Sequence, residues 1–239
     1  MSKHLYILIA ALCLPLAASA APMDLTAQIR EGGIPLMAIG LLSLLSVTVI
    51  IERLIHLRLR AVVPADLVAQ AETLWEQRDY KGVEALAADS DTTLGRVIAY
   101  LASHRQHGYT IVSSGAGDIA STELRAHQQK FYALAIVATV APIVGLLGTV
   151  LGMIDSFRMI AYADGMGNPA LLAGGISQAL INTAAGLCVA LPALLMHHYF
   201  KHRVANFGLN LEGKVNRLIN LWFLQEPDKQ LLQAVAHAH

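Results

Sequence analysis

The chain has 239 residues, of which 55% are hydrophobic and only 14% are charged, and its mean hydropathy is +0.52. Soluble domains carry about 25% charged residues, so this composition indicates a membrane protein. The 17 Lys and Arg residues are balanced by 17 Asp and Glu residues, which argues against a nucleic-acid-binding protein, because phosphate neutralisation needs an excess of clustered basic residues. Cys13 and Cys188 are the two cysteines. They build no disulfide framework or Cys-x-x-Cys motif, so we expect neither a metal site nor a cofactor.

Residues 1–20 have the pattern of a cleaved signal peptide. Lys3 and His4 precede an apolar run, and the small residues Ala18-Ser19-Ala20 form a cleavage site. The apolar run is short for a membrane span, which needs about 20 residues. The alternative is an uncleaved anchor. Either way, residues 21–31 are expected in the periplasm of a bacterial cell.

Three later segments are long and apolar enough to cross a membrane. They are predicted as transmembrane helices over residues 32–51, 131–157 and 171–200. Lys and Arg gather at one end of each segment and, by the positive-inside rule, place those ends in the cytoplasm. These residues are Arg53, Arg58, Arg60, Arg125, Lys130, Lys201 and Arg203. The sequence thus predicts a large cytoplasmic loop over residues 52–130 and a periplasmic turn over 158–170. A cytoplasmic C-terminal helix that continues the third span, followed by a tail, is predicted over 201–239.

The cytoplasmic loop shows helical spacing of its apolar residues, as in Leu67, Ala71 and Leu74. We expect a helix to start after Pro64 and another to span residues 94–104. Residues 109–117 contain several small residues and are expected to be a flexible connector, after which a helix runs unbroken into the second span. The predicted fold class is all-α: a polytopic membrane protein whose three long transmembrane helices extend into a helical cytoplasmic domain.

Small residues recur at helical spacing within the second and third spans. Such stripes let helix backbones approach closely in lipid. Pro142 would kink the second span or free a carbonyl group there. The predicted packing and kink residues are Pro142, Gly145, Gly148, Gly152, Gly175 and Gly186.

Four polar residues belong to this region: Thr183 lies on the stripe of the third span, and Thr149, Gln178 and Asn182 lie beside the stripes. Polar side chains that face lipid are costly, so these should face protein or water. They are candidates for lining a pore. The alternative is structural, because membrane threonines bond carbonyls of their own helix and amides join neighbouring helices.

Asp155 is the one carboxylate within the three predicted spans and is a further candidate for a proton pathway. Arg158 follows three residues later, so an ordinary interfacial ion pair is the alternative. We find no nucleophile with a partnered base, so the sequence predicts no enzyme.

Two motifs, one in the second span and one in the third, resemble those of the ExbB/TolQ/MotA proton-channel family. Their sequences are more similar to ExbB than to TolQ. They are GLLGTVLGM at residues 145–153, after Pro142, and GGISQALINTAAGLCVALPAL at 174–194. The Glu52-Arg53 pair also fits. The resemblance implies an inner-membrane homopentamer whose second and third spans surround a pore. It further implies ExbD-type single-span partners, each with a membrane aspartate, and transmission of proton-motive force to TonB for outer-membrane uptake.

By position, Thr149 and Thr183 match the pore-lining threonines of that family. Gln178 stands where some relatives carry glutamate, and Asn182 replaces a smaller residue. The resemblance therefore implies that protonation rests on the partner's aspartate. A TolQ-like role in outer-membrane maintenance, or a passive pentameric scaffold, is the alternative function.

Overall fold

The computed structural model describes residues 33–57, 62, 64–162 and 169–224. The predicted signal peptide and residues 21–31 lie outside the described residues, as does much of the predicted periplasmic turn. Within the described part every element is a helix, and no strand occurs. The all-α fold class is confirmed.

The chain divides into two units, and the long helices run through both. Unit 1 contains residues 33–43 and 139–190 of the described chain, and unit 2 contains residues 44–138 and 191–224. Among the described residues, three helices are long and apolar enough to cross a membrane: α3 (Gly33–His56), α9 (Tyr132–Tyr162) and α10 (Pro169–Ile219). At about 1.5 Å rise per residue, the 24 residues of α3 extend about 36 Å, more than a hydrocarbon core of about 30 Å.

Exposed apolar side chains cover the membrane-length parts of α3, α9 and α10. A soluble protein would bury such continuous apolar surface, whereas a bilayer solvates it. Ile34 is 78% exposed, Leu41 69%, Ile143 64% and Leu180 64%. The expectation of three apolar helices of spanning length is confirmed.

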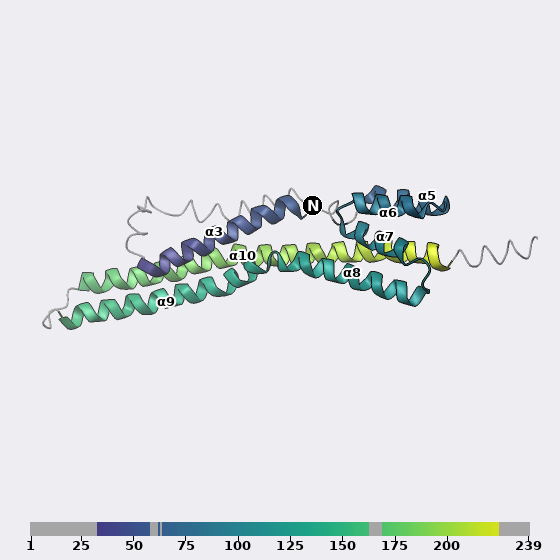
Figure 1. Cartoon of the computed structure of the whole chain (residues 1–239). Coiled ribbons are helices and arrows are strands. Elements are labelled where there is room, and N and C mark those ends of the chain that lie inside the picture. The colour runs from purple at the N-terminus through teal and green to yellow at the C-terminus, as the bar shows by residue number, and fades with distance from the viewer. Residues whose placement is uncertain (1–32, 58–61, 63, 163–168, 225–239) are drawn as a thin grey trace, which may run out of the picture. The chain divides into compact units, whose positions relative to one another are not determined.

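Unit 2 contains a helical core built from four helices and the C-terminal half of α10 (Figure 1). These helices are α5 (Ala65–Glu76), α6 (Tyr80–Asp89), α7 (Thr93–Ser103) and α8 (Tyr109–Gln129). Asp79 and Thr92 cap α6 and α7 by accepting hydrogen bonds from the backbone N–H groups of Gly82 and Gly95. The fully buried apolar residues include Ala71, Val83, Leu94, Val97, Ile98, Leu101, Leu211 and Leu218.

The end of α10 is fixed onto α5 by aromatic and charged contacts. The rings of Trp75 and Trp222 are stacked with centroids 4.0 Å apart, and Arg217 forms an ion pair of 2.9 Å with Glu72. Trp222 lies in the π-helical turn η1 (Asn220–Leu224), which directly continues α10. The expectation that the third span continues as a helix beyond residue 200 is confirmed.

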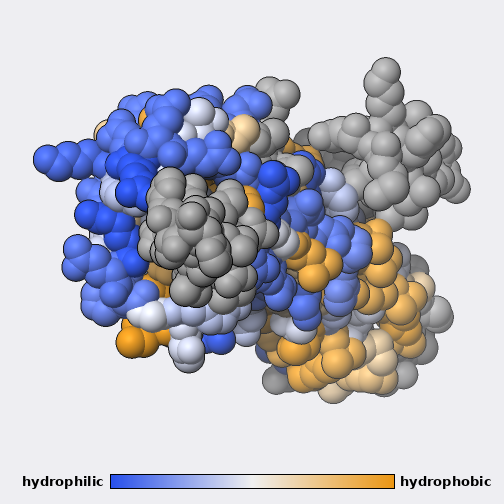
Figure 2. Space-filling view, turned by 90° about the vertical axis from the view of Figure 1, so that its right-hand side faces the viewer, coloured by the Kyte–Doolittle hydropathy of each residue, from blue (hydrophilic) through white to orange (hydrophobic). Residues whose placement is uncertain are grey.

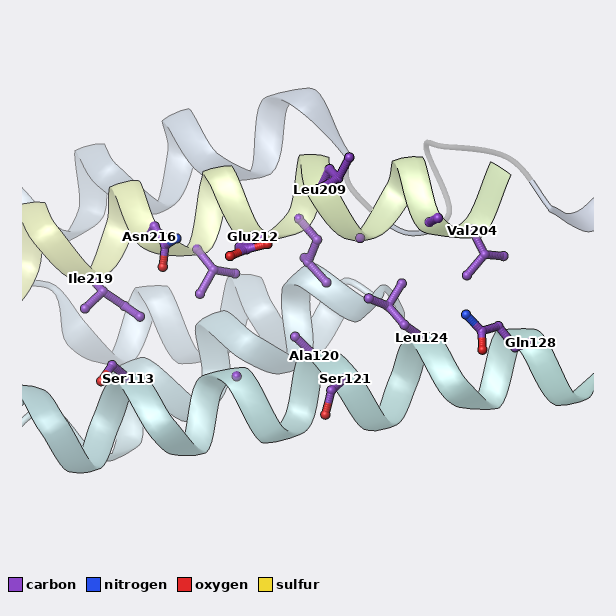
Figure 3. A pocket seen from close by; sticks show the side chains of 15 residues that line it. Ser113, Ala120, Ser121, Leu124, Gln128, Val204, Leu209, Glu212, Asn216 and Ile219 are labelled. Atoms are coloured by element: carbon purple, nitrogen blue, oxygen red, sulfur yellow. The ribbon is translucent and has the colours of Figure 1, made fainter. Parts of the chain in front are cut away.

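The surface of unit 2 that is visible in Figure 2 is mostly hydrophilic. A groove of about 460 Å³ opens between α8 and α10, and Figure 3 shows its lining. Small residues and Leu124 line it on the α8 side, and Val204 and Ile219 line the α10 side. Glu212 and Asn216 add polar groups.

The prediction of a flexible connector over residues 109–117 is wrong, because this stretch is the first half of α8. Its small residues serve close packing: Val112 and Ala116 are fully buried, and a methyl group on Gly115 would collide with the hydroxyl of Tyr100. The expected unbroken helix is also interrupted, by a turn at Lys130 and Phe131 between α8 and α9.

Candidate functional site

Within unit 1, α9 and α10 lie side by side and are in contact along the small residues that the sequence places on one stripe of each helix (Figure 1). The contact is tight because these residues have little or no side chain. A methyl group on Gly152 would lie 3.1 Å from Cβ of Ala179, and one on Gly175 would collide with the hydroxyl of Ser156. Close packing of this kind is what associates helices in lipid, where the hydrophobic effect contributes little.

The closest backbone approach is at Gly186. A methyl group there would lie 2.6 Å from the carbonyl oxygen of Ala141 and 3.2 Å from Cα of Gly145. A methyl group on Gly145 would in turn lie 3.1 Å from Cα of Thr183. Because backbone atoms cannot rotate away, these two glycines fix the distance between the helices.

Asn182 lies inside this contact and faces Gly148. Asn182 is only 2% exposed. A methyl group on Gly148 would lie 2.7 Å from the Cβ atom of Asn182 and 2.8 Å from its Nδ2 atom. The Oδ1 atom of Asn182 is buried and has no hydrogen-bond partner among the described residues. Asn182 therefore packs between the two helices within a single chain.

The two threonines bond backbone carbonyls in different ways. The hydroxyl of Thr149 donates to the carbonyl of Leu146 in its own helix, at 2.6 Å. The hydroxyl of Thr183 donates across the helix pair to the carbonyl of Gly145, at 3.3 Å. Thr149, Thr183 and Gln178 are all partly exposed, so these side chains are accessible at the edge of the contact. A pore-lining role for the four polar residues stays a prediction.

Pro142 lies within α9, which continues through it. A second proline, Pro192, lies within α10 and is part of unit 2. Each proline lacks an N–H group, so the carbonyl four residues earlier loses its helical donor. Pro142 is among the packing and kink residues predicted from the sequence and Pro192 is not, although both are prolines within an apolar helix.

Asp155 forms the ion pair with Arg158 that the sequence predicts as the alternative to a proton pathway. The two charged groups are 2.9 Å apart, and both side chains are more than 60% exposed. An exposed pair of this kind contributes little to stability.

A charged cluster lies in unit 2, where α3 ends near α7 and α8. It surrounds a pocket of about 370 Å³ and includes Arg53, Arg96, His127 and Lys130. Arg53 is paired with Glu52, and Arg96 contacts Asp91 at 3.4 Å and Glu123 at 3.0 Å. Burial lowers the pKa of His127, and the charge of Lys130 lowers it further, while Glu123 acts in the opposite direction.

This lowered pKa makes the protein less stable in acid. Below the ordinary histidine pKa of about 6.5, the unfolded chain binds a proton at His127 more readily than the folded chain, so stability falls as the pH falls. We expect the wild type to lose more thermal stability between about pH 7.5 and about pH 5.5 than His127→Gln. His107→Gln, which removes an exposed histidine, serves as the control. Equal losses in the wild type and His127→Gln would contradict this account.

These features define a helical membrane protein whose second and third long helices pack through glycines and carry hydroxyl and amide groups. Residues 106–212 match the MotA/TolQ/ExbB proton channel family. Over these residues the resemblance to that family identified from the sequence is confirmed.

Three relatives illustrate the similarity. The chain is 29% identical to "Biopolymer transport protein exbB1" of Vibrio cholerae over 183 residues, which is 75% of this chain and 80% of the relative. It is 38% identical to "Biopolymer transport protein ExbB" of Salmonella typhimurium over 33% of this chain and 32% of the relative. It is 44% identical to "Tol-Pal system protein TolQ" of Pseudomonas aeruginosa over 29% of this chain and 30% of the relative. The last two matches thus span about a third of each relative.

Proposed function

We propose that this chain is the inner-membrane proton-channel subunit of a TonB–ExbB–ExbD type complex. It would use proton-motive force to power TonB-dependent uptake of iron-siderophores, vitamins or other cargo across the outer membrane. The observation that carries the proposal is the pair of partly exposed threonine hydroxyls, Thr149 and Thr183, beside the glycine-packed contact of α9 and α10. The relative named exbB1, matched over 75% of this chain, supports this branch of the family.

The proposed assembly is a homopentamer in which the second and third spans of each copy surround a central pore. Single-span ExbD-like subunits would occupy the pore, and a TonB-like protein would receive the energy. The N-terminus would lie in the periplasm and the C-terminal tail in the cytoplasm, because Lys and Arg gather at the ends of the spans assigned to the cytoplasm. A multi-pass position in the inner membrane follows from this orientation.

The chemistry of the chain suits a supporting role in proton transfer. Residues 131–154 and 171–200 contain no Asp, Glu, Lys or Arg, and the amides of Gln178 and Asn182 do not titrate. Hydroxyl groups both donate and accept hydrogen bonds, so Thr149 and Thr183 can order water around a partner's aspartate. The proton itself would be taken up and released by that aspartate.

Uptake of a labelled ferric siderophore tests the proposal in a strain that lacks this gene and its close relatives. Wild type should restore uptake, and Thr149→Val with Thr183→Val should reduce it to the level of an empty vector, at matched protein levels. Thr48→Val is the control, because Thr48 lies in the first span and bonds the carbonyl of Leu44 in its own helix. It should restore uptake like the wild type.

Two other outcomes would support a different function for the chain. Full uptake with the double valine variant would make the chain a passive pentameric scaffold. Failure of the wild type in uptake, together with restored detergent resistance in a strain that lacks TolQ, would assign it to outer-membrane maintenance. The relative named TolQ in Pseudomonas aeruginosa is the observation behind this second candidate.

A further inference from the structure

Another pocket in unit 2 differs from the charged cluster at the end of α3 in the charges of its lining residues. It has a volume of about 360 Å³ and lies where α8 ends and α9 begins, beside α10. None of the described residues that line it carries a carboxylate. Its lining residues are Arg125, Gln128, Gln129, Phe131, Tyr132, His197 and Lys201.

The basic groups of this pocket are available for an anion. Neither Arg125 nor Lys201 forms an ion pair in the described part of the chain, whereas Arg53 and Arg96 in the other cluster are both paired with carboxylates. Gln128 and Gln129 add amide N–H donors. A set of donors with no competing carboxylate suits a phosphate group.

The position of the pocket suits the head group of a lipid. It lies at the ends of the second and third spans that the charge distribution assigns to the cytoplasm. Tyr132 lines it and is 61% exposed, as is common for aromatic residues at a membrane interface. Farther along the two spans the surface is apolar, with Ile136 47% exposed, Leu194 44% and Leu195 51%. An acyl chain can lie against such a surface while the head group stays at the pocket.

We propose that this pocket binds the phosphate group of an anionic phospholipid of the cytoplasmic leaflet. Arg125 and Lys201 contact the phosphate oxygens, and the lipid's acyl chains cover the exposed apolar residues of α9 and α10. This inference rests on the proposed membrane orientation and is independent of the transport role. Its occupant would bind at the junction of the membrane helices with the helical core of unit 2.

Native mass spectrometry of the purified full chain tests this proposal by titration with dioleoylphosphatidylglycerol. We expect Arg125→Gln with Lys201→Gln to bind this lipid roughly 10- to 30-fold more weakly than the wild type, since each basic residue at a membrane surface contributes to anionic lipid binding. Lys81→Gln with Lys214→Gln is the matched control, because it removes the same charge from residues outside the pocket. It should bind like the wild type.

Two further measurements distinguish binding of the lipid from binding of a free anion. Dioleoylphosphatidylcholine should bind more weakly than the glycerol lipid, and inorganic phosphate at the same concentration should not compete with the lipid. Equal weakening in the control and the pocket variant would overturn the proposal, as would competition by phosphate alone. Circular dichroism checks that both variants remain helical. Siderophore uptake is a separate assay, so a failure here does not alter the outcome of the functional test.

Discussion

Gly186→Ala should weaken the contact between α9 and α10, although alanine is the better helix former. The new methyl group would lie 2.6 Å from the backbone oxygen of Ala141, so the helices must move apart and lose close contacts along their length. Overpacking of this kind costs about 1–3 kcal/mol, whereas the gain in helix propensity is about 1 kcal/mol. We expect a net loss of stability in reversible unfolding of the full chain in mixed micelles.

Gly174→Ala is the matched control on the same helix. A methyl group at Gly174 would meet no atom within 4 Å, so only the propensity term applies and the variant should be as stable as the wild type or more so. A Gly186→Ala variant that matched Gly174→Ala in stability would show that the helices do not approach as closely as the structure places them.

The features predicted well from the sequence depend on composition and periodicity. Long uncharged runs identify the three helices of membrane-spanning length, because a helix that is apolar all round over about 20 residues is typical of a membrane span. Glycines at helical spacing identify the packed stripe on α9 and α10, since the spacing of small residues is a local property of each helix. The ion pair of Asp155 and Arg158 follows in the same way from a separation of three residues.

The predictions that were wrong concern contacts with residues of other helices, which the local sequence does not reveal. The small residues near Gly115 resemble a flexible connector until Tyr100 is placed against them. The sequence places Thr183 on the stripe and Asn182 beside it, because helical spacing alone does not show which of two adjacent residues, about 100° apart in direction, lies at the centre of the contact. Asn182 holds that position, facing Gly148. The proposed pore would be formed by several chains, so the structure of a single chain does not test it.

Gly148→Ala should be destabilising in a way that a change at Asn182 reverses. The new methyl group would lie 2.7 Å from Cβ of Asn182 and 3.0 Å from Cγ, which are side-chain atoms. Because the closest atom is Cβ, Asn182→Ala leaves the collision in place, and Asn182→Gly removes it. The glycine also removes the Oδ1 atom that is buried without a partner, and so relieves a desolvation cost.

A double-mutant cycle in the micelle unfolding assay measures this coupling. Gly148→Ala alone should cost about 1–3 kcal/mol, and Asn182→Gly alone about 0.3 kcal/mol for helix propensity, because Asn is itself a poor helix former. The double variant should be more stable than their sum predicts by about 0.5–3 kcal/mol. Pairing Asn182→Gly with Gly186→Ala should show no such gain, because the obstacle at Gly186 is the backbone of Ala141. Additivity in the first pair would mean that Asn182 does not face Gly148, and a pore-lining position for its amide would then be favoured.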